Sequence, residues 1–236
     1  MIQRRRRPTN LYRTLQMKKA RQSVEDLLYS TAKKQLGQGF SGLQTRLRRL
    51  KKDEIDDFLD EWEQEWLDAF DEALMLAFTT FGQVEEDWYG KHGIEVGYDS
   101  YEVVRSYKAA QKVSRTTDKV REEVGKKITD WFTSDAPIDD LIESLSGQFG
   151  ESRARLIAIN ETTTIGSFMT LDIMRSAGLE KWSWETRKDD IVCPICGDLD
   201  GQIFTSRDDM PPDASHIGCR CGAAPVIPLM EEDWEE

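Results

Sequence analysis

The sequence predicts a mainly α-helical protein, in which a multi-helix body precedes a small C-terminal α+β module that binds zinc. Apolar residues recur every three or four positions through most of the first 178 residues, as they do on the buried face of a helix. After Gly178 the pattern changes to short alternating segments around a cysteine cluster. We expect four parts: a basic, partly helical N-terminal arm (1–52), a helical body (53–178), a zinc module (179–227) and an acidic tail (228–236).

Charge is distributed unevenly along the 236 residues, whose formal net charge is −12. Residues 1–52 contain fifteen lysines or arginines and only two acidic residues. The arm opens with four consecutive arginines: Arg4, Arg5, Arg6 and Arg7. Guanidinium groups attract phosphates and carboxylates, so this run is a candidate contact for DNA or an acidic protein. The alternative is pairing with the acidic remainder of the chain. No run of eighteen apolar residues occurs, so we expect no membrane-spanning segment.

Two long helices are expected in the first part of the chain. The first lies within the basic arm and is interrupted by Gly37, Gly39 and Gly42. The second begins near Asp53 and ends near Gly82. Its apolar stripe, which we interpret as core packing, contains Ile55, Phe58, Leu59, Trp62, Trp66, Phe70, Leu74, Phe78 and Phe81.

Further helices are expected between residues 101 and 177. One pattern spans 101–131, with a candidate break at 114–117. A cap residue followed by Pro137 predicts the start of a short helix. The last helix extends from about Glu151 to Ala177 and ends at Gly178. Within it, Glu161 is either a buried partner of an arginine or of an amide in the cysteine module, or an exposed charge.

Short strands are expected after this helix. Trp182, Trp184 and Thr186 alternate with polar neighbours, as do Ile203 and Thr205. The sequence Leu-Asp-Gly at 199–201 predicts a tight turn before the second strand. Residues 223–227 are a candidate third strand.

All four cysteines of the chain lie between residues 193 and 221. Cys193 and Cys196 are separated by two residues, which allows both sulfurs to face one metal ion, and His216, Cys219 and Cys221 follow across a loop. This spacing predicts a structural zinc ion held by four of these five residues. Disulfides are an alternative that suits a secreted chain, but no signal peptide is expected here. A redox pair would need a thioredoxin-like pattern around it, which the sequence lacks.

Matching positions surround these cysteines in the segment from about residue 153 to residue 226. They are Ala158, Glu161, Thr162, Lys181, Trp182, the run 190–196, the run 199–201, Phe204, Pro211, Pro212, His216, the run 219–221, Pro225 and Val226. With this ordered set the segment resembles the phage head morphogenesis family, the Mu F-like minor head proteins. The chain departs from the family pattern at Ile159-Asn160, where Arg-Thr is usual, and at Ile217, where proline is usual.

The resemblance implies a non-catalytic component of capsid assembly that acts near the portal. It implies the portal protein and other head proteins as partners, with phage DNA as a further candidate through Arg4 to Arg7. It also implies a location in the virion, inside the capsid near the portal, and in the host cytoplasm during assembly.

Two other functions compete with this interpretation. A treble-clef nuclease of the His-Asn-His type also places a histidine after a Cys-x-x-Cys knuckle, but it needs a catalytic histidine besides the zinc ligands. If His216 binds zinc, only His92 remains, and we expect His92 to be an exposed loop residue. A bacterial adaptor that uses the zinc module for docking is the other alternative. The sequence has no glycine-rich phosphate loop and no His-Glu-x-x-His motif, so we expect no enzymatic activity.

Overall fold

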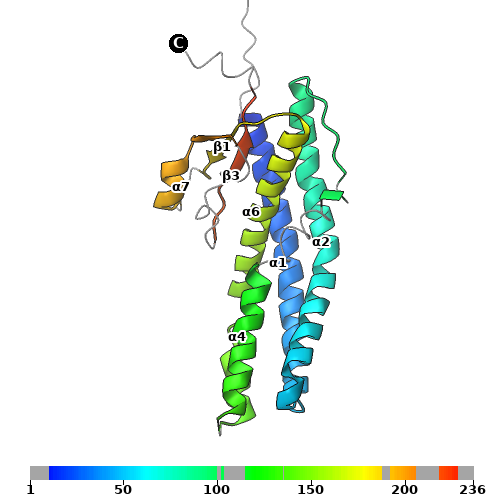
Figure 1. Cartoon of the computed structure of the whole chain (residues 1–236), viewed down its shortest axis with the longest axis vertical. Coiled ribbons are helices and arrows are strands. Elements are labelled where there is room, and N and C mark those ends of the chain that lie inside the picture. Colours follow the sequence, from blue (N-terminus) through cyan, green and yellow to red (C-terminus); the bar gives the residue numbers. More distant parts are fainter. Residues whose placement is uncertain are drawn as a thin grey trace, which may run out of the picture.

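A long helical bundle carries a small sheet beside one of its ends (Figure 1). The structure is a computed structural model that describes residues 11–99, 102–103, 115–134, 136–187, 192–205 and 218–227. Its elements are α1 (Leu11–Leu47), the short 3-10 helix η1 (Lys52–Glu54), α2 (Ile55–Lys91), α4 (Arg115–Phe132), α5 (Ile138–Ser146), α6 (Glu151–Ser176), β1 (Trp182–Glu185), α7 (Pro194–Leu199), β2 (Ile203–Phe204) and β3 (Gly222–Pro225). The predicted fold class, mainly helical with a small C-terminal α+β module, is confirmed.

Helices α1 and α2 set the length of the bundle. Each has 37 residues, which corresponds to about 55 Å at the α-helical rise of about 1.5 Å per residue. The two helices pack against each other. The buried apolar residues of α1 recur at helical spacing: Met17, Ala20, Val24, Leu28, Ala32, Leu36, Leu43 and Leu47. The described part of the basic segment is therefore an integral layer of the bundle.

The predicted interruption of α1 at its glycines is wrong. The helix continues through Gly37, Gly39 and Gly42 without a break. A glycine inside a helix costs roughly 0.5–1 kcal/mol relative to alanine. Leu36 and Leu43, which flank the first and last glycine, are almost fully buried, and burial of a leucine side chain contributes about 1.5–3 kcal/mol. Packing therefore outweighs the local preference for a break.

The predicted end of α2 near Gly82 is also wrong, because the helix continues to Lys91. A Cβ atom at position 82 would lie 2.2 Å from Cζ of Tyr98, whose ring crosses the helix at this point. The hydroxyl of Tyr98 donates to the carbonyl oxygen of Thr79 at 3.3 Å. Gly82 therefore provides space for the returning chain and does not end the helix.

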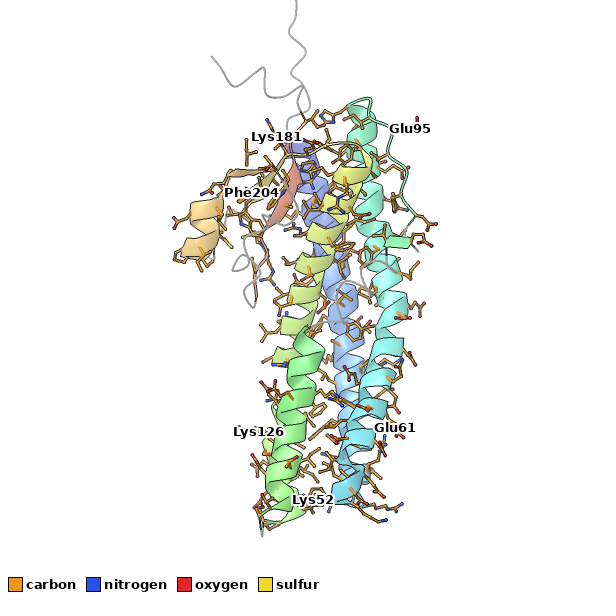
Figure 2. The ribbon with its side chains drawn as sticks, in the orientation of Figure 1. Lys52, Glu61, Glu95, Lys126, Lys181 and Phe204 are labelled. Atoms are coloured by element: carbon orange, nitrogen blue, oxygen red, sulfur yellow. The ribbon has the colours of Figure 1, made fainter. Side chains whose placement is uncertain are left out.

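The end of the bundle away from the sheet is closed by α4 and α5. Helix α4 contacts α2 and α5, and α5 also contacts α1. Figure 2 places Lys126 of α4 and Glu61 of α2 in this half, with Lys52 at its tip. Phe149, in the segment that follows α5, stacks on Phe40 with ring centroids 5.0 Å apart and meets the edge of Trp62 at 5.8 Å. These rings join α1, α2 and the segment after α5 at this end of the bundle.

Helix α6 occupies the other half, between α1, α2 and the sheet. It contacts all three, and sixteen of its residues are buried, on nearly every side of the helix. A helix that is buried all round belongs to the interior of a fold. Its predicted extent agrees closely with the observed one, and Gly178 follows with a positive φ of 69° that only glycine adopts easily. Glu161 lies within this buried set, at 6% exposure.

The sheet has three antiparallel strands in the order β2-β1-β3. Trp182 of β1 pairs with Phe204 of β2, and Trp184 pairs with Ala223 of β3. The predicted turn before β2 is confirmed, with Gly201 at a φ of 77°. The predicted strands are present, although the third begins one residue earlier and ends at Pro225. Helix α7 was not predicted.

A buried ion pair connects α1, α2 and α6 close to the sheet. The Nε and Nη2 atoms of Arg13 donate to the two carboxylate oxygens of Glu85 at 3.0 and 2.5 Å. Thr170 of α6 donates to the same carboxylate at 2.6 Å. The side chains of Arg13 and Glu85 are 3% and 0% exposed. Each charge is thus removed from water but satisfied by a direct partner, which fixes the position of α1 on the other two helices.

Candidate metal centre

The four cysteines belong to two short segments that meet at the sheet. Cys193 is the N-cap residue of α7, and Pro194 follows in the first turn, where its fixed φ suits a helix start. Cys196 lies one turn further along the same helix. Cys219 and Cys221 directly precede β3. Pairing of β1 with β3 therefore brings Cys219 and Cys221 beside Cys193 and Cys196 of the α7 segment. The two pairs of cysteines are separated by more than twenty residues in sequence.

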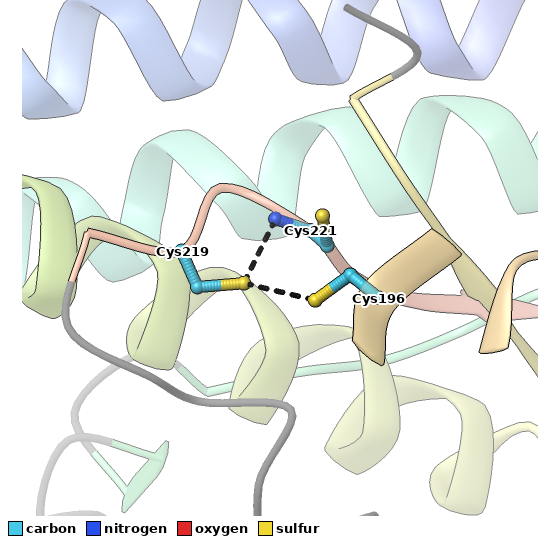
Figure 3. Close-up of side chains that lie close together, drawn as sticks. All are labelled: Cys196, Cys219 and Cys221. Atoms are coloured by element: carbon cyan, nitrogen blue, oxygen red, sulfur yellow. Dashed lines mark hydrogen bonds between the residues drawn. The ribbon is translucent and has the colours of Figure 1, made fainter. Parts of the chain in front are cut away.

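Three of the sulfurs form one compact cluster (Figure 3). The Sγ atoms of Cys196, Cys219 and Cys221 all lie within 4.8 Å of one another, and those of Cys196 and Cys219 are 3.6 Å apart. Two thiolates on a tetrahedral zinc ion, each at about 2.3 Å, would be about 3.8 Å apart. The three residues are 0%, 3% and 4% exposed. Both the donor type and the spacing of the sulfurs fit a thiophilic metal.

Backbone amides of the two segments are directed at the sulfurs. The amide of Cys196 donates to Sγ of Cys193 at 3.3 Å, and the amide of Cys221 donates to Sγ of Cys219 at 3.4 Å. Such bonds favour a negatively charged sulfur. Burial raises the pKa of the Cys196 thiol. The hydrogen bond with Cys219 instead holds the pKa of Cys221 below its usual range.

The remaining predicted site residues are placed differently. Cys193 is half-buried and packs against the aromatic cluster of the module, and its sulfur is not among the three that meet within 4.8 Å. His216 lies outside the described residues, as does the arginine run from Arg4 to Arg7. The choice of four ligands among Cys193, Cys196, His216, Cys219 and Cys221 therefore stays a prediction.

Helix α6 holds the second cysteine segment through its polar side chains. The Oδ1 atom of Asn160 accepts a hydrogen bond from the amide of Gly218 at 2.8 Å. One helical turn later, the hydroxyl of Thr163 donates to the carbonyl oxygen of Cys219 at 2.5 Å. Gly218 itself has a φ of 82°. Asn160 is one of the positions at which the chain departs from the family pattern noted above, and here it has a direct positioning role.

Aromatic packing holds the other side of the module. The ring of Trp182 stacks on Phe204 with centroids 4.4 Å apart and meets Trp184 edge-on at 6.5 Å. Figure 2 shows Phe204 on the side of the bundle that carries the module. Leu171 and Met174 of α6 belong to the same apolar cluster as Cys196, Cys219 and Cys221. The sulfurs of Cys196, Cys219 and Cys221 therefore lie within a buried apolar cluster.

Helix α1 reaches the same segment from the other direction. The Nη1 atom of Arg21 donates to the carbonyl oxygen of Arg220 at 2.6 Å. Glu25, one turn along α1, accepts from Nε and Nη2 of Arg220 at 3.2 and 2.7 Å. Burial, with the nearby charge of Arg13, lowers the pKa of Arg21. Arg220, between Cys219 and Cys221, is thus bound to α1 through both its backbone carbonyl and its side chain.

These positioning residues were missed in the sequence. Asn160, Thr163, Arg21 and Glu25 lie 56 to 199 positions away from the residues they hold. No local spacing rule connects residues so far apart. For Asn160 and Thr163 the available signal was their chemistry, since small polar side chains in a largely buried helix need hydrogen-bond partners.

The histidine in the described residues is not arranged as a catalytic base. His92 is half-buried at the C-terminal end of α2 rather than exposed in a loop as expected. Its Nδ1 atom bonds to the carbonyl oxygen of Trp88 at 2.8 Å, and its ring lies 4.5 Å from the Trp88 ring. These contacts are typical of a residue that completes a helix end.

Comparison with known proteins places this architecture in one family. The family model described as phage Mu protein F like protein matches residues 93–224, which is more than half of the chain. The chain therefore belongs to the phage Mu F-like family, a family of head morphogenesis proteins. The match begins some sixty residues before residue 153, where the segment with the family-like motifs begins. No match is found among curated proteins or among solved structures.

The comparison also bears on partners and on the membrane. Membership of a phage head protein family implies other head components as partners. Among the described residues, none of the helices combines the length and the apolar character that crossing a bilayer requires.

Proposed function

We propose that this protein is a minor head protein that acts without turnover during capsid assembly, near the portal. Family membership supports the assembly role. The observation that carries the non-catalytic part is the burial of the cysteine cluster, whose three thiols are at most 4% exposed. Catalytic zinc sites keep a coordination position open to water or substrate, whereas structural sites are closed by protein ligands. A buried cluster packed among Trp182, Trp184 and residues of α6 suits the closed kind.

In this proposal Cys196, Cys219 and Cys221 supply three ligands to a structural zinc ion, and Cys193 or His216 supplies the fourth. A bound zinc ion would cross-link the α7 knuckle to the segment before β3. The module needs such a link, because its three strands contain only ten residues in total. Sheets this small rarely bury enough apolar surface to be stable alone.

The partners follow from the proposed place in the head. The portal protein and other head proteins are the proposed contacts, and the arginine run at residues 4–7 is a candidate contact for phage DNA. Several described arginines of the same basic segment are paired with carboxylates of the bundle. Arg46 pairs with Glu61, and Arg48 pairs with Asp139 at 2.8 Å. Internal pairing thus accounts for part of the basic charge, and the terminal arginines are the proposed external contact.

The test is the location of the protein in assembled particles. Heads purified from the phage or prophage that encodes the chain would be cross-linked and analysed by mass spectrometry. We expect the chain in the particle, with cross-links to the portal protein. Absence from heads, with the protein found only in the soluble host fraction, would contradict the assembly role and favour the bacterial adaptor.

A further inference from the structure

Arg13 and Arg21 of α1 lie near the sheet, the first buried and the second half-buried, and only Arg13 has a carboxylate partner among the described residues. Arg13 forms the bidentate pair with Glu85 described above. Arg21, two turns further along the helix, forms no ion pair with any carboxylate in the described ranges, and its Nε atom is buried without a hydrogen-bond partner. A buried charge without a partner is costly. The position of Arg21 therefore requires an explanation.

The guanidinium of Arg21 lies against the cysteine segment. Its Nη1 atom donates to the carbonyl oxygen of Arg220. A Cβ atom at Gly222 would lie 2.5 Å from Nη2 of Arg21, so the guanidinium group occupies the space beside the residue that follows Cys221. Glycine at this position admits the close approach. The cation is thus in contact with the backbone on both sides of Cys221.

Three ionisable groups near Arg21 raise its pKa against the effect of burial, and two of them are candidate metal ligands. They are the carboxylate of Glu185 and the sulfurs of Cys221 and Cys219. Glu185 is at 3.9 Å from Nη1 of Arg13, and its side chain is 30% exposed. Its charge is therefore shared with another arginine and screened by water. Besides Glu185, the sulfurs of Cys221 and Cys219 are the candidate counter-charges for Arg21.

We propose that Arg21 is the charge partner of the thiolate–metal centre and positions its Cys219-Arg220-Cys221 segment. Cysteine binds a metal as a thiolate, so a divalent ion with three or four cysteine ligands has a net negative charge. This charge supplies what Arg21 lacks. The inference rests on the proposed metal site, and it adds that metal binding and the packing of α1 against the module stabilise each other.

Two substitutions separate the charge of Arg21 from its hydrogen bond. Arg21→Gln removes the charge but retains a donor for the Arg220 carbonyl, whereas Arg21→Lys retains the charge. Lys19→Gln is the matched control, since Lys19 is exposed on the same helix and the charge change is identical. Zinc affinity of the full-length chain would be measured by competition with a chromophoric chelator, and circular dichroism would verify the helix content of each variant.

We expect Arg21→Gln to weaken zinc binding by about 10–100-fold, the range typical of residues that support metal ligands. Arg21→Lys should retain most of the zinc affinity, and Lys19→Gln should bind zinc as tightly as the wild type. Wild-type affinity in Arg21→Gln would overturn the inference, and so would an equal loss in Arg21→Lys and Arg21→Gln. Failure of the wild type itself to bind zinc would instead overturn the metal site, so the two failures are distinguishable.

A measurement on the unmodified chain covers the case in which Arg21→Gln does not fold. Hydrogen exchange of the backbone amides would be compared before and after zinc removal by a chelator. We expect faster exchange in residues 17–28 of α1, next to the cysteine segment, and unchanged exchange in residues 36–47 at the far end. Equal behaviour of the two segments would overturn the coupling.

Discussion

The substitution Glu85→Gln tests the buried ion pair that fixes α1 in the bundle. Glu85 accepts three hydrogen bonds, two from Arg13 and one from Thr170, and its side chain is 0% exposed. Glutamine would leave the buried Arg13 cation with only the partly exposed Glu185 carboxylate, 3.9 Å away, as a counter-charge, and would place an amide group where only acceptors fit. Removal of one partner from a buried pair costs about 3–5 kcal/mol, so we expect the free energy of unfolding to fall by about that amount.

Urea denaturation of the intact chain would measure the change, with Glu61→Gln as the matched control. Glu61 pairs with Arg46 on the same two helices, but its side chain is 67% exposed. Exposed pairs contribute about 0–1 kcal/mol. The double substitution Arg13→Met/Glu85→Met should be less destabilising than Glu85→Gln, because no lone charge stays buried. Equal shifts of the unfolding midpoint in Glu85→Gln and Glu61→Gln would refute the reasoning.

Four further predictions concern α1, the metal centre, catalysis and the N-terminal arginines. Gly37→Ala should stabilise the chain by about 0.5–1 kcal/mol in urea denaturation, because α1 is helical there and no atom lies within 4 Å of the added Cβ; destabilisation would indicate a broken helix. Cys219→Ser should abolish stoichiometric zinc binding in metal analysis, and full retention would exclude Cys219 as a ligand. Supercoiled DNA with Mg²⁺, Mn²⁺ or Ni²⁺ should remain intact, whereas nicking that disappears in His216→Ala with zinc retained would identify a nuclease. If the arm binds duplex DNA, its affinity should fall by orders of magnitude between low and physiological salt, and deletion of residues 1–10 should weaken it; binding unaffected by this deletion would exclude the arginine run.

Local features of the fold could be predicted from the sequence. Helical spacing predicted α1 and located the apolar face of α2, because such a face repeats within a few residues of the chain. The helix end at Gly178 and the turn at Gly201 could be predicted for the same reason, since a positive φ strongly favours glycine. The cysteine spacing located the candidate metal centre. All of these signals depend on residues close together in sequence.

Features that depend on distant residues could not be predicted. The glycines of α1 and Gly82 of α2 suggested breaks, and only tertiary packing explains why both helices continue. Arg13 and Glu85 are 72 positions apart, and Glu25 and Arg220 are 195 positions apart. The sequence shows that Arg13 belongs to a basic segment, but it does not show which carboxylate pairs with it. The structure instead makes α1 a support for the cysteine cluster.

Metal content is the most direct test of the central claim, that a structural zinc ion closes the module around Cys196, Cys219 and Cys221. The full-length chain would be purified without chelators, and its zinc would be measured together with the reactivity of its four cysteines toward a thiol reagent. The account predicts one zinc ion per chain and thiols that react only after the metal is removed. A chain without zinc, whose four thiols react freely in the folded state, would contradict it.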